Sequence, residues 1–255
     1  MIPLSDDNPT LRTPVVTYLL LAAIGVTWVF VQGAGLNSLA LISSVCNLGL
    51  VPGELTGLAP LGLRVPLGQG LACVVDNEAI NRFTPVTSMF LHGSWGHILG
   101  NCLFFWVFGN NVEDSMGRLR FLVFYLVCGL AAAAAQVMMD PGSPIPMVGA
   151  SGAISGIMGA YLILYPRVRV NMLFIFFIII RIIPLPAWAV LLWWFGVQVL
   201  TGLPQLNQLE SQGGVAVWAH VGGFIAGVVL IKLFENRALT SQRTGWRHRL
   251  HPDHP

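Results

Sequence analysis

The dominant pattern in the chain is a series of long apolar runs separated by polar or proline-rich connections. Six of these runs have the length expected of membrane spans, and they cover residues 14–31, 83–108, 121–139, 148–165, 187–203 and 215–234. A helix needs about 20 apolar residues to cross the hydrocarbon core of a bilayer. The pattern therefore predicts an all-α polytopic membrane protein, with six transmembrane helices in one domain over residues 14–235.

The remaining segments are interpreted from their composition and their place in the chain. Residues 172–183 are apolar but short, and Arg181 interrupts them, which favours a re-entrant or interfacial segment. Residues 1–13 form a polar N-terminus, and residues 32–82 form a long first loop rich in Gly, Pro and Leu. The polar stretch 236–255 is expected to be a disordered tail.

The composition agrees with a membrane protein. Hydrophobic residues make up 55% of the chain and charged residues 9%, with a mean hydropathy of +0.72, whereas soluble domains carry about 25% charged residues. A net charge of +2 is too small to indicate a nucleic-acid partner, so the lipid bilayer is the expected surface partner. The four cysteines lack a metal-binding spacing. Cys102 and Cys128 lie in apolar runs, whereas Cys46 and Cys73 share the first loop, where a disulfide stays an open alternative.

Basic residues are distributed unequally between the two sides of the predicted bundle. With six spans, Arg64 and Arg82 fall on one side, and the other eleven of the 13 Lys and Arg residues fall on the side of the termini. These eleven are Arg12, Arg118, Arg120, Arg167, Arg169, Arg181, Lys232, Arg237, Arg243, Arg247 and Arg249. Because cytoplasmic loops carry the excess of basic residues, both termini are predicted to be cytoplasmic and the first loop extracytoplasmic. The short loops favour a bacterial inner membrane.

Three of the predicted spans carry polar side chains at a similar depth. Counting from the charged end of each span places Ser151 at roughly 24 Å, and both His220 and Asn101 at roughly 18 Å, with His97 one turn further out. Polar side chains at membrane depth are costly and mark functional sites by default. A hydroxyl and an imidazole on closely packed helices are the components of a nucleophile and its base.

The fourth predicted span begins inside the membrane. The Pro-rich segment 141–146 cannot be helical, so the helix is expected to begin near Ser151. Its first turn then presents unpaired backbone N–H groups and the positive end of the helix dipole. Irregular backbone at that depth is tolerated where it lines a water-filled cavity. A cavity that opens to the extracytoplasmic side and admits hydrolytic water is therefore expected.

Small residues predict that the fourth and sixth spans pack closely. The fourth span carries Gly152, Gly156 and Gly159 on one face. The sixth carries Gly223 and Gly227 on the same face as its histidine. Small residues at such spacings let transmembrane helix backbones approach one another, which would bring the histidine close to the serine.

Three motifs, in order along the chain, carry a resemblance to a known family. They read LHGSWGHILGN over residues 91–101, GASG over 149–152 and AHVGG over 219–223. The stretch FGNNVED over 108–114 adds to them. Together these stretches resemble the rhomboid family of intramembrane serine proteases. The resemblance implies a six-helix bundle with a short fourth helix.

The same resemblance implies a catalytic dyad and no cofactor. It makes Ser151 the nucleophile and His220 the general base, in an endopeptidase that cleaves transmembrane segments of protein substrates. No carboxylate occurs within a predicted span near His220, in agreement with a dyad. Ser155, one turn deeper, is expected to pack or to bond to backbone.

The resemblance also implies an oxyanion site formed by His97, Asn101 and the backbone N–H of the catalytic serine. The two side chains are four residues apart, so one helical face presents both of them. His92 is expected to orient the first loop rather than to act in catalysis. The supporting glycines of the three motifs are Gly149, Gly152 and Gly223.

Other functional classes are less compatible with the sequence. A zinc site formed by His92, His97 and His220 is disfavoured because His92 and His97, five apart, fall on different helical faces, and the HExxH motif is absent. No metal site is therefore predicted. A channel or transporter would also contain broken helices and polar groups at mid-depth, but the sequence shows no inverted repeat and no carboxylates within the spans for ion coupling. A non-proteolytic protein that binds transmembrane clients is a further alternative, although the chain keeps both the serine and the histidine.

Overall fold

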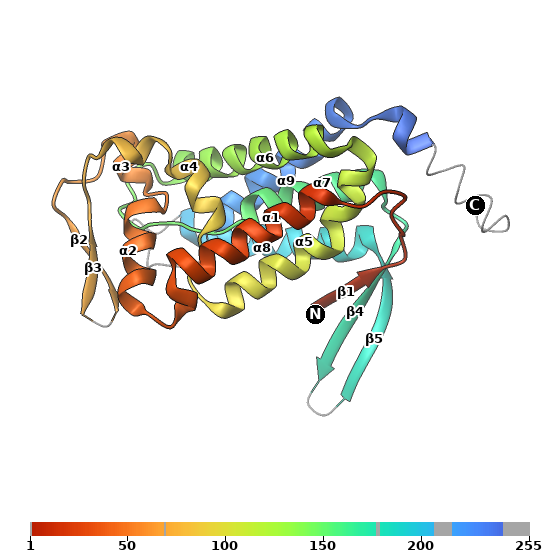
Figure 1. Cartoon of the computed structure of the whole chain (residues 1–255), viewed down its shortest axis with the longest axis horizontal. Helices are drawn as coiled ribbons and strands as arrows, with labels where there is room; N and C mark the ends of the chain where they lie inside the picture. Colours follow the sequence, from red (N-terminus) through yellow and green to blue (C-terminus); the bar gives the residue numbers. More distant parts are fainter. Residues whose placement is uncertain (1, 69, 177–178, 207–215, 242–255) are drawn as a thin grey trace.

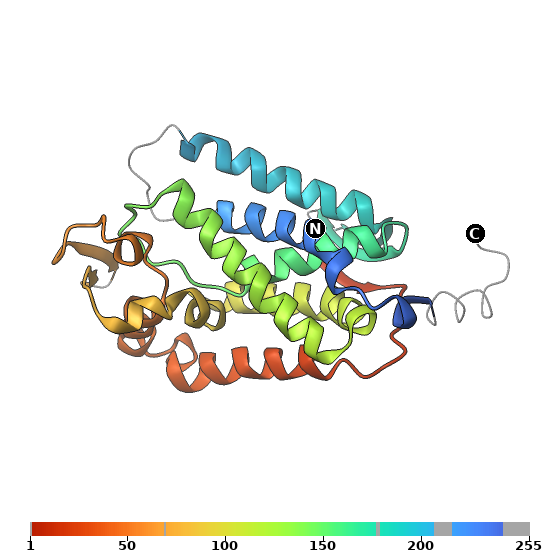
Figure 2. The same ribbon diagram turned by 90° about the horizontal axis from the view of Figure 1, so that it is seen from above.

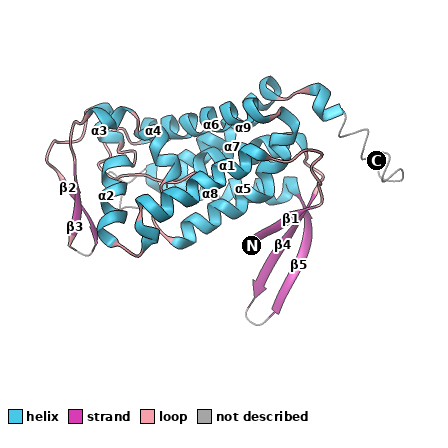
Figure 3. Ribbon diagram, in the orientation of Figure 1, coloured by secondary structure: helices cyan, strands magenta, loops and turns pink. Residues whose placement is uncertain are grey.

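The computed structural model describes residues 2–68, 70–176, 179–206 and 216–241, and most of its elements are helices. The long helices run side by side along the longest axis of the molecule (Figures 1 and 2). They are α1 (Val15–Val26, continued by a π-helical turn over Thr27–Val31), α5 (Trp95–Met116), α6 (Arg118–Met139), α7 (Ser151–Leu164), α8 (Ala187–Gly202) and α9 (Val217–Phe234). Strands lie at both ends of this bundle (Figure 3).

Each of the six predicted runs overlaps one of these helices, but the helices differ in length and polarity. Within the described residues, α6 and α9 are the two helices long and apolar enough to cross a membrane. The apolar helices over Val15–Val31, Ser151–Leu164 and Ala187–Gly202 are shorter. The structure therefore agrees with a helical membrane bundle, while the number of helices that span the membrane stays a prediction.

The predicted bounds of the second span, 83–108, are wrong. Two short turns come first, α4 (Thr84–Thr87) and η4 (Ser88–Phe90), and the helix α5 starts only at Trp95. The start is set by Ser94, whose hydroxyl accepts the backbone N–H of His97 at 3.2 Å and so caps the helix. Apolar composition alone does not reveal such a cap.

The helix α5 also extends beyond the predicted end at residue 108, because its last polar residues form hydrogen bonds and an ion pair within the protein. The carboxylate of Glu113 accepts the backbone N–H groups of Val16 at 3.0 Å and Thr17 at 2.8 Å. These N–H groups lie in the first turn of α1, where they lack partners within the helix. Asp114 pairs with Arg12 at 3.3 Å. The acidic residues of the FGNNVED stretch therefore fasten α1 to α5.

The prediction that the glycine-rich faces pack closely is confirmed. The helices α7 and α9 lie against each other so tightly that a methyl group at Gly223 would overlap the carbonyl oxygen of Gly152. A methyl group at Gly227 would overlap the carbonyl oxygen of Gly156 in the same way. Because backbone atoms stand on both sides of each contact, the approach of the two helices depends on these residues being glycine.

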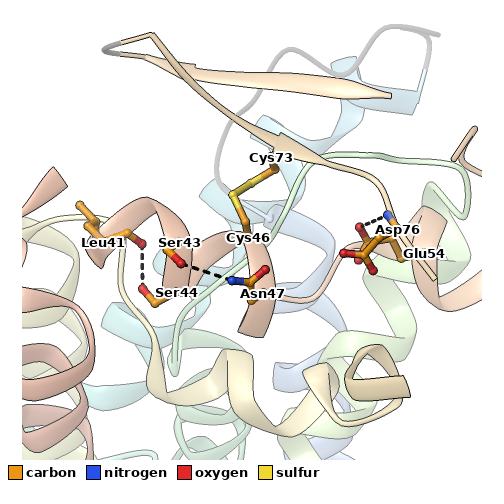
Figure 4. The surroundings of a disulfide bond; sticks show 8 residues. All are labelled: Leu41, Ser43, Ser44, Cys46, Asn47, Glu54, Cys73 and Asp76. Carbon is orange, nitrogen blue, oxygen red and sulfur yellow. Dashed lines mark hydrogen bonds between the residues drawn. A yellow bond between two sulfur atoms is a disulfide. The ribbon is translucent and has the colours of Figure 1, made fainter. Parts of the chain in front are cut away.

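The first loop forms a folded cap over one end of the bundle. It contains α2 (Ser38–Leu48), α3 (Pro52–Thr56), η3 (Ala79–Arg82) and the antiparallel strands β2 (Arg64–Gly68) and β3 (Leu71–Val74). The Asn37 side chain caps α2 by accepting two backbone N–H groups at 3.1 Å. A disulfide between Cys46 and Cys73 joins α2 to β3 (Figure 4). The pairing that the sequence left open is thus present in the structure.

Reduction of this disulfide is expected to lower the free energy of unfolding by about 2–4 kcal/mol, because a cross-link over a loop of this size restricts the unfolded chain. The sequence separation of Cys46 and Cys73 is 27 residues. The measurement is thermal unfolding of the purified protein with and without a reducing agent. A variant with both cysteines replaced by serine is the control, and reducing agent should not change its unfolding. Equal unfolding midpoints for the oxidised and reduced wild-type protein would contradict the prediction.

A three-stranded antiparallel sheet projects from the other end of the bundle (Figures 1 and 3). Its order is β1 (Ile2–Asp6), β4 (Arg169–Phe176) and β5 (Ile179–Pro186). The chain is therefore not purely α-helical. The described residues of the stretch 172–183, predicted to be re-entrant or interfacial, lie in the paired strands β4 and β5, consistent with their β-branched and aromatic side chains.

Described residues near both ends of the chain contact this same region of the bundle. The predicted N-terminal segment 1–13 contributes β1, and Asp6 accepts a hydrogen bond from Asn111 of α5 at 2.8 Å. The backbone N–H of Asn236 donates to the carbonyl of Ser115 at 3.0 Å, so the predicted tail begins in contact with the bundle. The remainder of that tail, 242–255, lies outside the described residues.

Candidate active site

Ser151 is the first residue of α7, and two separate segments hold the chain that leads to it. Leu50 in the first loop exchanges backbone hydrogen bonds with Met147, at 2.8 and 3.0 Å. The N–H of Gly149 donates to the carbonyl of Ser88 at 2.9 Å. The predicted start of the short helix at Ser151 is confirmed. Its N–H lies in the first helical turn, where backbone donors have no partner within the helix.

Gly149 adopts a backbone conformation that other residues rarely take, with φ of 132°. A side chain here would also meet the imidazole of His97, since an added Cβ would lie 2.7 Å from Nε2 of that ring. The same Cβ position is 3.4 Å from Oγ of Ser151. The glycine therefore allows the imidazole and the serine hydroxyl to border the same small space.

The serine hydroxyl and the α9 histidine form a direct hydrogen bond. Oγ of Ser151 lies 2.7 Å from Nε2 of His220, and the histidine is 9% exposed. The two residues are 69 positions apart and come together because α7 and α9 pack through their glycines. A hydroxyl that donates to an imidazole nitrogen is the arrangement in which the base can remove the hydroxyl proton.

Ser155 lies deeper in the same helix and has a different environment. It is fully buried, and its hydroxyl donates to the carbonyl of Gly152 at 2.7 Å. An added Cβ at Gly223 would lie 2.6 Å from this hydroxyl oxygen. Ser155 therefore bonds to its own helix and packs against α9, and its hydroxyl proton is engaged by the Gly152 carbonyl.

Asn101 and His97 of α5 border the same space as Ser151. The amide nitrogen of Asn101 lies 2.8 Å from Nε2 of His92, which is fully buried. The backbone of His92 is in turn held by the Gln32 side chain, which accepts its N–H and donates to its carbonyl, both at 2.8 Å. One amide hydrogen of Asn101 is thereby held by His92, while the side chain also lines the cavity.

The histidines of this region are not arranged as a set of metal ligands. His92 precedes α5, so the helical-face reason given against a zinc site does not apply to it. The rings of His92 and His97 instead meet edge to face with centroids 5.0 Å apart, and Nε2 of His92 is engaged by Asn101. Among the described residues, no group of three or more His, Cys, Asp or Glu side chains is placed to hold a metal ion.

The candidate site lies in one cavity of about 1000 Å³ between α5, α6, α7, α8 and α9. Ser151, His220, His97 and Asn101 all contribute to its wall, together with the Pro146–Gly149 segment. His92 stands behind Asn101 and does not line it. The cavity therefore combines a serine hydroxyl, a base and hydrogen-bond donors in one space.

Sequence reasoning missed three glutamines that support this site. Gln198 of α8 lies 2.9 Å from Nδ1 of His220. Gln136 of α6 accepts the N–H of Ala219 at 3.2 Å, next to that histidine. Gln32 holds the backbone of His92. Gln136 and Gln198 are uncharged amides inside apolar runs, so the rule that polar groups at membrane depth are functional could have found them.

Similarity to known proteins identifies the family of this chain. A family model described as Rhomboid domain matches residues 81–237. Rhomboid protease GluP of Bacillus subtilis is 40% identical over 77 residues, which are 30% of this chain and 15% of that protein. Rhomboid protease AarA of Providencia stuartii is 30% identical over 156 residues, 56% of this chain and 52% of that protein.

A plant relative gives a similar match. RHOMBOID-like protein 5 of Arabidopsis thaliana is 27% identical over 166 residues, which are 61% of this chain and 53% of that protein. The chain thus spans about half the length, or less, of these relatives. The family match covers more than half of the chain and includes every residue of the three motifs. This protein is therefore a member of the rhomboid family of integral membrane proteins.

Proposed function

We propose that this chain is an intramembrane serine endopeptidase that cleaves transmembrane segments of other membrane proteins. The observation that carries the proposal is the 2.7 Å hydrogen bond between Oγ of Ser151 and Nε2 of His220. It lies in a cavity between helices, in a family whose named relatives include proteases. No cofactor is needed, because a base-activated hydroxyl supplies the nucleophile.

In the proposed reaction, Oγ of Ser151 attacks the carbonyl carbon of the scissile peptide bond while Nε2 of His220 takes the hydroxyl proton. The resulting imidazolium then donates this proton to the leaving amine, and an acyl-enzyme ester forms. A water molecule, activated by the same imidazole, hydrolyses the ester and regenerates the hydroxyl. A lone histidine can serve both proton transfers because it acts first as base and then as acid.

Negative charge that develops on the substrate carbonyl oxygen needs hydrogen-bond donors in fixed positions. We assign this role to the Ser151 N–H and to the side chains of Asn101 and His97. The N–H is at a helix N-terminus, which favours negative charge. A 3.4 Å hydrogen bond from the Gly93 N–H to Nδ1 of His97 leaves the ring proton on Nε2, the nitrogen that borders the cavity.

Within the membrane we propose the six-helix arrangement that the sequence predicts. Arg12 and Arg120 lie at the end of the bundle where α5 meets α6, whereas Arg64 and Arg82 belong to the first-loop cap at the other end. The positive-inside rule then favours cytoplasmic termini and a cavity open to the extracytoplasmic side. We propose this orientation in a bacterial inner membrane, with strands β4 and β5 at the cytoplasmic interface.

The proposal is tested with the purified full-length chain, reconstituted with a model transmembrane substrate. Cleavage within or beside the substrate helix is expected, together with covalent labelling of Ser151 by a serine-directed phosphonate, mapped by mass spectrometry. Chelator-sensitive cleavage would contradict serine chemistry. Binding of the substrate without cleavage would favour the client-binding alternative, and ion flux through substrate-free vesicles would favour a channel or transporter.

Replacement of Asn101 by alanine is expected to lower kcat about 10²- to 10³-fold, the usual consequence of losing one oxyanion donor. Substrate binding, reported by KM, should change little because the donor acts on charge that develops in the transition state. Cleavage kinetics and thermal unfolding are measured together. Asn47→Ala, on the exposed side of the first loop, is the matched control and should retain activity. A kcat within a factor of about two of wild type would contradict the assignment.

A further inference from the structure

His220 makes a second side-chain hydrogen bond that a two-residue mechanism does not use. Its Nε2 contacts Ser151 at 2.7 Å, and its Nδ1 lies 2.9 Å from the amide oxygen of Gln198. Gln198 comes from α8, a different helix from those that carry the serine and the histidine. In the described part of the chain, no carboxylate forms a hydrogen bond with His220.

The two contacts are chemically linked through the single proton of a neutral imidazole. When Nε2 accepts the serine hydroxyl, the ring proton must be on Nδ1, and Nδ1–H then needs an acceptor. The Gln198 carbonyl oxygen is such an acceptor, and it fixes both the tautomer and the rotation of the ring. We propose that Gln198 is a positioning residue of this protease, which orients His220 as the third member of a Ser-His-Gln hydrogen-bonded set. This inference rests on the proposed function.

The position of Gln198 is held by aromatic packing on the same face of α8. Trp194, one helical turn earlier, lies against the His220 ring with centroids 5.7 Å apart. The neighbouring Phe195 stacks on Phe224 of α9 with centroids 4.6 Å apart. Aromatic pairs at such distances contribute to packing beyond their buried area. The face of α8 is therefore docked on α9 with the amide oxygen directed at Nδ1.

An amide is also suited to the charge that develops during the reaction. His220 becomes an imidazolium when it takes the serine proton, and the carbonyl dipole of Gln198 stabilises that positive charge. A carboxylate would stabilise it more strongly, but would itself have to be kept ionised in a poorly solvated site. Glutamine gives orientation and part of the electrostatic stabilisation without a buried formal charge.

The test compares two substitutions of similar size in the full-length reconstituted protein. Gln198→Met removes the acceptor and is expected to lower kcat about 10- to 100-fold, the effect of one hydrogen bond to a charged group. The rate of phosphonate labelling should fall by the same factor, because it reports the nucleophilicity of Ser151 without the transmembrane substrate. Gln198→Glu keeps an acceptor oxygen and is expected to restore most of both rates. Leu200→Met, exposed on the same helix, is the control and should behave as wild type.

The outcomes separate a positioning role from a purely structural one. A fall in kcat with unchanged KM and unchanged unfolding temperature, rescued by Gln198→Glu, supports the inference. Wild-type kcat in Gln198→Met overturns it, and so does an equal loss in both variants with a lowered unfolding temperature. Ser151→Ala is assayed in parallel. If Ser151→Ala still cleaves, the proposed function itself fails. If Ser151→Ala is inactive and Gln198→Met is fully active, the positioning role alone fails.

Discussion

Replacement of His220 by alanine is expected to lower kcat for peptide-bond cleavage about 10⁴- to 10⁶-fold, and replacement of Ser151 by alanine should have a comparable effect. Nε2 of His220 is 2.7 Å from the serine oxygen, so this imidazole of α9 is placed to remove the hydroxyl proton. Water inside the protein is a poor substitute for that base. Loss of the base therefore leaves a neutral hydroxyl, which is a poor nucleophile.

The double variant provides a sharper measurement than either single variant. Residues that act as one unit show strongly non-additive losses, so Ser151→Ala combined with His220→Ala should be no slower than the slower single variant. Cleavage is followed by mass spectrometry of the products, and folding is checked by thermal unfolding. Ser155→Ala is the matched control, since this hydroxyl bonds to the Gly152 carbonyl. Cleavage at the wild-type rate by the His220 variant would rule out the dyad.

Replacement of Gly227 is expected to have the largest effect on stability. A methyl group at this position would overlap the Gly156 carbonyl oxygen, and the obstacle is backbone on both helices, so no side-chain rotation can relieve it. Gly227→Ala should therefore destabilise the protein by about 3 kcal/mol or more, at the upper end of overpacking. Gly227→Val is expected to prevent folding.

The same substitution should also reduce activity, because separation of α7 from α9 lengthens the Ser151–His220 hydrogen bond. Unfolding temperature and kcat are measured for Gly227→Ala in the same detergent. Gly196→Ala on α8 is the matched control, because a Cβ there meets no atom within 4 Å. This control should be neutral or slightly stabilising, since alanine has the higher helix propensity. An unchanged unfolding temperature in Gly227→Ala would contradict the prediction, because it would show that α7 and α9 can move apart without loss of stability.

Much of the helical architecture could be predicted from the chain because it depends on local properties. Apolar length indicates where a helix can cross a bilayer, and the proline-rich segment 141–146 accounts for the start of α7 at Ser151. The spacing of Gly223 and Gly227 indicated that α9 packs closely, which the structure confirms. Family membership followed from the order of three short motifs, and the match over 81–237 confirms it.

Other features could not be predicted because they depend on contacts between distant segments. Within the second predicted span, 83–108, the helix begins only after Ser94, because the Ser94 hydroxyl caps its first turn. The length of the apolar run does not reveal this start. The described residues of the 172–183 stretch lie in strands β4 and β5, and the pairing of β4 with β1 requires an N-terminal segment that is far away in the chain. Pairing of Cys46 with Cys73 depends on how α2 and β3 meet.

By itself, the sequence determined the membrane class, the close packing of two glycine-faced helices and the family. These follow from composition and from residue types at fixed spacing, which act within one helix or one helix pair. Only the tertiary structure decided how the groups in the cavity are held in place: that His92 holds Asn101, and that Gln198 reaches Nδ1 of His220. A hydrogen bond depends on position within a few tenths of an ångström, and several packed helices together set that position.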